Sequence, residues 1–244
     1  MPSNKEHKYS ARFEVKYLVP SHLRVAVIRD IQSMTSRDAY AVGNRQSYGV
    51  RSLYYDSRRF SAYYEKMAGI LRRLKFRIRT YKETPDVKYL EIKERMSNRI
   101  IKRKVRLNPE ILNILMHSRN PLAHPDFSDS SVLKEFYYYK CTLGLEPLLT
   151  IEYRRRPFVG KTHRNLRITF DFDITTSSSR ELDQQGGKYR ILSSGYSVLE
   201  IKFNNTMPHW IHSLVKKYSL QDQAYSKYCL GLEKLVKKGV LHIV

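Results

Sequence analysis

Residues 74–81 (LKFRIRTY), 89–95 (YLEIKER) and 101–107 (IKRKVRL) decide the fold, because each stretch alternates apolar and charged side chains. Side chains two positions apart lie on the same face of a β-strand, so each stretch predicts a strand with one apolar and one charged face. The same alternation occurs at residues 12–17 (RFEVKY). Further strands are expected at residues 50–56, 148–155, 166–173 and 198–203. The pattern therefore predicts a domain built around a β-sheet.

The charged faces of these strands are mostly cationic. Like charges that lie opposite each other on neighbouring strands destabilise a sheet, and an anion bound between them would remove that penalty. Acids are interspersed in three Glu-x-Lys pairs, which are Glu14/Lys16, Glu91/Lys93 and Glu200/Lys202. Since both members of a pair lie on one strand face, the carboxylate could hold a divalent metal while the lysine binds a phosphate oxygen. Cross-strand salt bridges, each worth little, are the alternative explanation.

If such a sheet closes into a barrel, its interior is lined by cations with a few carboxylates among them. That arrangement suits a threaded, metal-bound phosphate chain. No glycine-rich phosphate loop of the GxxxxGK[ST] kind occurs, so the chain would bind ATP through side chains.

Composition restricts the class of protein. The 244 residues include 45 lysines and arginines and 23 acids, which gives a formal net charge of +22 and points to a polyanionic partner. Acids within the binding face oppose a nucleic-acid surface, so no nucleic-acid partner is expected. No apolar run approaches the roughly 18 residues of a membrane span, and the N-terminus lacks a signal-peptide core. Two cysteines, Cys141 and Cys229, form neither a disulfide framework nor a zinc site, and a cytoplasmic location is expected.

One domain is expected over residues 11–235, between a flexible N-terminus (1–10) and a C-terminal tail (236–244). Helices are predicted after Pro20, from the capping sequence Asn108-Pro109-Glu110, over residues 132–143, and after Pro208. Residues 35–47 and 175–195 are predicted to be loops.

The motifs of this chain follow one another in a specific order: RFEVKY (12–17), VRSLYYD (50–56), YYEKMAG (63–69), KFRIRTY (75–81), YLEIKER (89–95), LRITFDFDI (166–174), VLEIKF (198–203), PHW (208–210) and SKYCLG (226–231). This order resembles that of the VTC domain, the catalytic module of the vacuolar transporter chaperone polyphosphate polymerase. The VTC domain belongs to the triphosphate tunnel metalloenzyme superfamily and has stand-alone bacterial relatives. The resemblance extends over nearly the whole chain.

The resemblance implies an α+β fold, in which helices surround a closed antiparallel β-barrel tunnel. It implies transfer of the γ-phosphate of ATP to a growing polyphosphate chain, with release of ADP and with bound Mn²⁺ or Mg²⁺. It also suggests association with a membrane partner protein. By motif, the catalytic, phosphate-binding cations are Lys16, Arg77, Arg79, Lys93, Arg155, Arg167, Lys202 and Lys227, and Arg51 and Lys104 extend this set toward phosphate or nucleotide. Glu200 matches the metal-binding glutamate, and Glu14 and Glu91 are candidates to support it.

Two residues depart from the related patterns. Arg12 stands where the wider superfamily has the first glutamate of Glu-x-Glu-x-Lys, and losing that carboxylate weakens a hydrolytic two-metal mechanism. Ala224 stands where yeast-type enzymes carry a lysine, three residues before Lys227, which predicts a weaker grip on the terminal phosphate. A tri- or polyphosphatase on the same barrel and a non-catalytic polyphosphate or RNA binder remain as alternatives to the polymerase.

Overall fold

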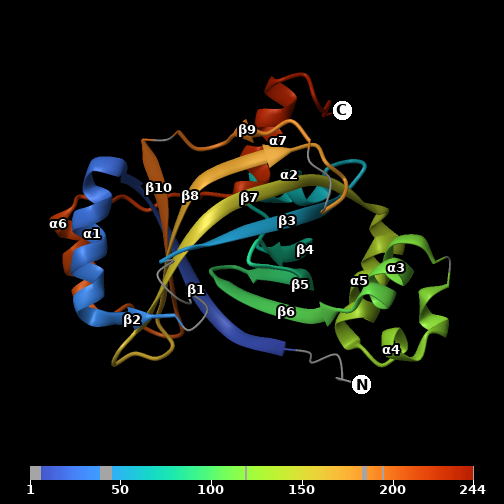
Figure 1. Ribbon diagram of the computed structural model, residues 1–244, viewed down its shortest axis with the longest axis horizontal. Helices are drawn as coiled ribbons and strands as arrows, with labels where there is room; N and C mark the ends of the chain where they lie inside the picture. The colour runs from blue at the N-terminus through green and yellow to red at the C-terminus, as the bar shows by residue number, and fades with distance from the viewer. Residues whose placement is uncertain (1–6, 39–45, 119, 183–185, 194, 244) are drawn as a thin grey trace.

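The computed structural model describes residues 7–38, 46–118, 120–182, 186–193 and 195–243, and of residues 7–10 it describes the backbone alone. Eight long strands form one antiparallel sheet that closes on itself (Figure 1). They are β1 (His7–Pro20), β3 (Tyr48–Ser57), β4 (Arg72–Tyr81), β5 (Thr84–Met96), β6 (Arg99–Leu107), β7 (Leu145–Gly160), β8 (Arg167–Ser177) and β10 (Tyr196–Phe203). Their order around the ring is β10–β1–β6–β5–β4–β3–β7–β8, and β8 pairs with β10 to complete it.

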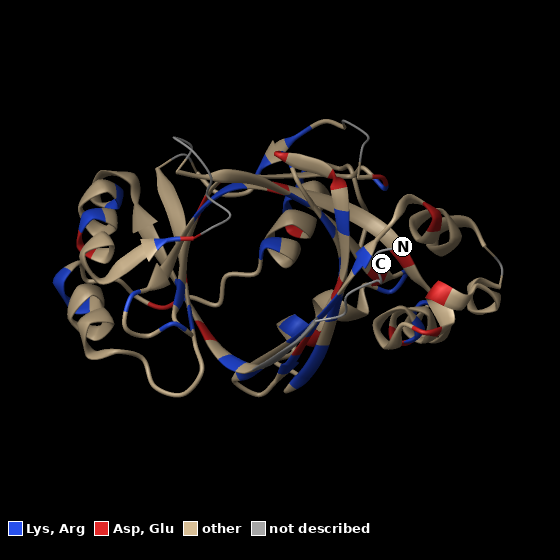
Figure 2. Ribbon diagram, turned by 60° about the horizontal axis from the view of Figure 1, so that its bottom comes forward, with Lys and Arg blue, Asp and Glu red and all other residues tan. Residues whose placement is uncertain are grey.

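Two short strands extend this ring. β2 (Thr35–Arg37) pairs with β7, and β9 (Tyr189–Arg190) pairs with β8. The prediction of a closed antiparallel sheet is therefore confirmed, and Figure 2 looks into the ring.

Helices cover the apolar outer faces of the strands on two sides (Figure 1). On one side α1 (Ser21–Met34) and α6 (His209–Lys217) pack against residues such as Ile168, Phe170 and Ile201. On the other side lie α3 (Pro109–His117), the 3-10 turn η1 (Pro121–Ala123), α4 (Pro125–Ser128) and α5 (Ser131–Leu143). Their apolar side chains bury the outer faces of β4, β5 and β6, including Phe76 and Ile92. The apolar residues of each strand therefore face the helices, which leaves the charged residues for the inside of the ring.

A different pair of helices packs at the apolar part of the ring interior. α7 (Lys227–Lys237) places Tyr228, Cys229 and Leu232 in one cluster with Ile151 and Val198, and α2 (Ser61–Met67) lies beside it. A Cβ on Gly231 would stand 2.6 Å from Ile151 Cδ1, so the glycine lets α7 approach β7 closely. This helix gives the interior an apolar end and leaves the charged part next to it.

Several sequence-based boundaries are confirmed and others need correction. The Asn108 side chain accepts a hydrogen bond from Ile111 N at 2.6 Å and caps α3, and Gly144 ends α5 in the left-handed region, as expected. Residues 35–37 form β2 instead of a loop, because they pair with residues 158–160, and His7 to Tyr9 already belong to β1. α2, η1 and α4 were not predicted.

Residues 1–6, and residues 39–45, 183–185 and 194 of the two predicted loops, lie outside the described residues. In the predicted tail, Lys237 is still helical, and Val240, Leu241 and Ile243 pack against the α7 cluster.

Candidate functional site

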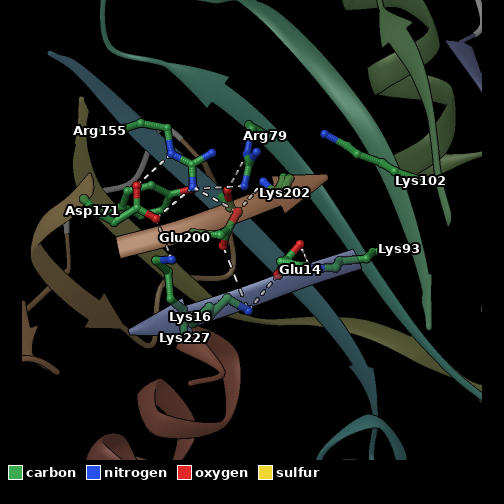
Figure 3. Close-up of polar contacts among 12 residues, drawn as sticks. Glu14, Lys16, Arg79, Lys93, Lys102, Arg155, Asp171, Glu200, Lys202 and Lys227 are labelled. Atoms are coloured by element: carbon green, nitrogen blue, oxygen red, sulfur yellow. Dashed lines mark hydrogen bonds and ion pairs between the residues drawn. The ribbon is translucent and has the colours of Figure 1, made fainter. Parts of the chain in front are cut away.

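The strand register brings the three Glu-x-Lys pairs and the alternating arginines onto the inner face of the ring. Lys16 of β1 lies opposite Glu200 of β10, and Glu14 lies opposite Lys202. Opposed residues of an antiparallel pair project to the same face, so these side chains meet (Figure 3). Figure 2 shows Lys and Arg on the strands that line the ring.

The first group of charges joins β1, β5 and β10. Glu14 accepts hydrogen bonds from Lys93 at 2.9 Å and forms an ion pair with Lys16 at 2.7 Å. Lys16 also lies 3.9 Å from Glu200, which is in close contact with Lys202. Both carboxylates are buried, and each is shared by at least two lysines (Figure 3). The cross-strand salt bridges are therefore real, and they lie on the face expected for phosphate binding.

A second group continues from Glu200 toward β7, β8 and α7. Arg155 binds Asp171 through two bonds of 2.7 Å, and its guanidinium lies 4.0 Å from Glu200. Lys227, the first residue of α7, forms an ion pair with Asp171 at 2.6 Å and lies over the ring of Tyr153. Asp171 is completely buried, so its two cations supply the compensation that a buried charge requires.

The third group surrounds Glu91 on β5. This carboxylate pairs with Arg77 at 2.7 Å, Lys102 at 2.5 Å and Arg79 at 3.6 Å. Arg77 also donates to the hydroxyl of Tyr54 at 2.8 Å. Within the described residues, no ion pair joins Glu91 or its three cations to Glu14 or Glu200, so this group is separate from the first two.

The three groups together contain eight cations and four carboxylates, so positive charge exceeds negative charge by four within them. Burial would raise the pKa of Glu91, yet Arg79, Lys102 and Arg77 together hold it well below its usual value. The lysines differ from one another: Glu14 and Glu200 raise the pKa of Lys16 in spite of its burial, whereas the pKa values of Lys93 and Lys102 are lowered. Burial lowers the pKa of Lys93 to about 7 despite Glu14, and Lys16 and Lys202 lower it further. Burial also lowers the pKa of Lys102, and Arg79 and Arg77 add to this. The site is therefore electrostatically suited to an added anion.

Most of the sequence-predicted cations lie in this interior, but not all. Lys16, Arg77, Arg79, Lys93, Arg155, Lys202 and Lys227 belong to the three groups described above. Arg167 is level with Lys202 in the register but is half-exposed and pairs with Asp38 at 3.1 Å. Lys104 lies over the ring of Tyr89, which is on the same strand face as Glu91.

Arg51 needs correction. The hydroxyl of its neighbour Ser52 accepts a hydrogen bond from the inward-facing Arg79, so Arg51 projects from the opposite side of β3. There it binds Glu152 at 2.7 Å, on the outside of the ring. Apolar and aromatic residues occupy both faces of β3, so the pattern of residues does not indicate which way Arg51 points.

Sequence reasoning missed Lys102, Asp171 and Thr169 as members of the site. Asp171 and Thr169 could have been found by applying period two from Arg167. The Thr169 hydroxyl is buried, has no hydrogen-bond partner among the described residues, and belongs to the residue opposite Glu200.

The model of the VTC domain family matches residues 11–236. The chain belongs to the VTC domain family. A structure from Bacillus halodurans, described as a candidate adenylate cyclase, is similar in fold with a TM-score of 0.55 and 14% identity. That similarity covers 90% of this chain and 95% of the other. The candidate adenylyl cyclase HpAC1 of Hippeastrum, described as having a dominant triphosphatase activity, has a TM-score of 0.48 and 13% identity over 95% of this chain and 97% of its own. No curated protein matches the chain.

The acidic residues of this VTC domain fit a divalent metal in a restricted way. Within the described residues, no group of three or more His, Cys, Asp or Glu side chains is arranged to hold a metal ion. Glu200 and Glu14 share Lys16, and the Thr169 hydroxyl, which has no hydrogen-bond partner among the described residues, belongs to the residue opposite Glu200 and adds a third oxygen. Magnesium typically binds through one or two carboxylates together with substrate phosphates. The residues fit that mode. Glu91 is set apart, because three cations already surround it.

None of the helices in the described part of the chain is long and apolar enough to cross a bilayer.

Proposed function

We propose that this VTC domain transfers the γ-phosphate of ATP to inorganic polyphosphate and that the phosphate chain lies along the inner face of the ring. The observation that carries the proposal is the convergence of eight cations from β1, β4, β5, β6, β7, β10 and α7 on one interior. A linear polyanion would contact cations from all of these elements at once. A surface stripe for nucleic acid would instead place its cations on the outside.

The arginines and the lysines of the interior would have different roles in this reaction. Arg155 and Arg79 present planar guanidinium groups, which bind phosphate oxygens in a bidentate manner and so fix the orientation of a phosphoryl group. Lys16, Lys93 and Lys202 are compact charges that would neutralise the chain and the charge that develops during transfer. Fixing donor and acceptor phosphates in one row makes the transfer effectively intramolecular.

Glu200, with Glu14, would hold a divalent cation of the Mn²⁺ or Mg²⁺ type. Such an ion would act as a Lewis acid and would stabilise the charge on the transferred group. Arg12, where the wider superfamily has a further glutamate, removes a carboxylate that a second metal would use. This favours transfer to a phosphate acceptor over a two-metal hydrolysis.

The experiment incubates the purified protein with ATP and Mn²⁺ and follows ADP, free phosphate and long-chain polyphosphate together. Transfer predicts ADP and polyphosphate in step, with little free phosphate. Glu200→Gln keeps the shape of the side chain and removes its charge, so metal-dependent turnover should collapse while thermal unfolding stays cooperative. Glu146→Gln, which alters an exposed pair with Arg58, is the matched control and should keep full turnover. Free phosphate without polyphosphate would assign hydrolysis, and unchanged turnover in Glu200→Gln would contradict the metal role.

A further inference from the structure

A second group of arginines lies on the outside of the ring, between α1 and the outer faces of β7 and β8. A cavity of about 230 Å³ opens there, lined by Arg24, Ile28, Ser47, Arg156, Phe170 and Phe172. It is separate from the interior site, because Arg156 follows the inward-facing Arg155 on β7 and therefore projects to the opposite face.

In the part of the chain that the structure describes, no acid pairs with these arginines. Arg24 donates to the Ser197 hydroxyl at 3.3 Å and lies over the ring of Phe172 at 5.4 Å. Arg156 lies over the ring of Phe158 at 5.5 Å, and Arg37 pairs in register with Phe158. Within the described residues, neither Arg24, Arg37 nor Arg156 has a carboxylate within ion-pair distance. The sequence of residues 39–45 (AYAVGNR) contains no acid either.

The acids nearest in the fold are engaged elsewhere. Asp38 pairs with Arg167, and Asp30 on α1 pairs with Lys217 at 2.6 Å. Exposed arginines in other parts of the molecule do pair with acids, as Arg58 does with Glu146 and Arg190 with Asp173. Burial, together with the charges of Arg37 and Arg24, lowers the pKa of Arg156. An anion bound between these guanidinium groups would relieve that repulsion.

The geometry points to a second anion-binding site in this cavity, which takes a small phosphate-bearing anion through Arg24 and Arg156. Guanidinium groups match phosphate oxygens in a bidentate manner, and several of them favour a multiply charged phosphate over a single carboxylate. The cavity is smaller than the roughly 300–1,000 Å³ of sites for drug-sized ligands, which favours a compact anion such as pyrophosphate over a polymer. The site lies back to back with the inner Arg155–Asp171 pair, because Phe170 and Phe172 flank Asp171 on β8.

The test is titration of the full chain with inorganic pyrophosphate by isothermal calorimetry at low ionic strength, in the presence of EDTA. We expect two classes of site, one in the ring and one in the outer cavity. Arg156→Gln should weaken one class at least tenfold and leave the other unchanged. Arg24→Gln on α1 should give the same loss from a different element, which covers the case of one variant folding poorly. Arg190→Gln, an exposed arginine of β9, is the control and should leave both classes intact.

A second measurement tests directly whether pyrophosphate covers the two arginines. Phenylglyoxal modification followed by mass spectrometry should show Arg24 and Arg156 protected by pyrophosphate and Arg190 unprotected. A single class of site in the wild-type protein, or equal modification of Arg156 with and without pyrophosphate, would overturn the proposal. Neither result would affect the interior site, whose occupancy is measured by the class that Arg156→Gln leaves unchanged.

Discussion

Glu91 provides the sharpest test of how the ring interior is stabilised. Its carboxylate is 1% exposed and pairs with Arg77, Arg79 and Lys102. Glu91→Gln keeps the volume of the side chain but leaves these three cations facing one another. Breaking a buried ion pair by removing one partner costs about 3–5 kcal/mol. Because the side chains of Arg77 and Lys102 keep 15% and 21% exposure and can reach water, we expect the lower end, a loss of about 3 kcal/mol in the free energy of unfolding.

The measurement is equilibrium unfolding in urea with EDTA and without phosphate. With an m-value of about 2–3 kcal/mol/M, the midpoint should fall by roughly 1–1.5 M. Glu146→Gln is the matched control, since the same change breaks an exposed pair with Arg58, and its effect should stay below about 1 kcal/mol.

The same variant should affect ligand binding in the opposite direction. Removing a negative charge from the interior raises its positive excess, so tripolyphosphate should bind several-fold more tightly and should restore much of the lost stability. If Glu91→Gln destabilises the protein by less than about 1 kcal/mol, the cations are not crowded as we infer. If it weakens tripolyphosphate binding, Glu91 positions the cations for the ligand, and its role as a counter-ion is refuted.

Three further predictions follow from single contacts. Thr169→Val removes a buried hydroxyl beside Glu200 that has no partner among the described residues, so it should raise the melting temperature of the ligand-free protein. The same variant should reduce the increase in melting temperature that tripolyphosphate causes. Thr176→Val is the control: it removes a second such hydroxyl near α7 and should raise the melting temperature while leaving the tripolyphosphate effect intact. The pKa of Lys93 is about 7 in the folded protein, below its unfolded value, so the folded state binds fewer protons than the unfolded state between pH 7 and about 10. The free energy of unfolding should therefore rise with pH in that window. Urea titrations at several pH values in EDTA should show this slope, and Lys93→Met should flatten it. Gly231→Val should lower the free energy of unfolding by about 1–3 kcal/mol, because its side chain would collide with Ile151, and an unchanged urea midpoint would contradict the close approach of α7.

The strands and their inner faces could be predicted because period two is a local property of the chain. Residues 74–81 and 89–93 alternate without interruption, and their register in the structure places Arg77 opposite Glu91 as the pattern requires. The order of motifs then supplied the family, and the family implied the closure of the sheet. Closure itself depends on pairings between strands that are far apart in the chain, such as β1 with β10 and β3 with β7, which no local pattern encodes.

The face on which a side chain lies could not be predicted where the two faces of a strand are chemically similar. Arg51 lies among Val50, Ser52 and Leu53, all of them buried, so alternation could not separate inside from outside. The contact between Lys102 and Glu91 could not be predicted for another reason. Both lie on the inner face of β6, and only the three-dimensional distance to Glu91 shows that Lys102 is the residue in contact with it. The role of α7 also depends on tertiary packing, since Tyr228 and Leu232 read simply as an apolar helix face in the sequence.

The Glu-x-Lys pairs admitted two explanations, salt bridges or phosphate chemistry, and the structure shows why these are not exclusive. Lys16 contacts Glu14 and Glu200, so the carboxylates act as counter-ions that allow a cationic interior to fold. The carboxylates are outnumbered two to one, which leaves charge for a ligand.

A phosphate chain that entered would compete with Glu14 for Lys16 and Lys93, and a divalent ion on the released carboxylate would offset the repulsion between carboxylate and phosphate. Metal and phosphate should therefore bind cooperatively: Mn²⁺ should tighten tripolyphosphate binding, and tripolyphosphate should tighten Mn²⁺ binding by the same factor. Calorimetric titration of each ligand in the presence of the other measures both factors, and metal binding that is independent of phosphate would contradict the shared use of these carboxylates.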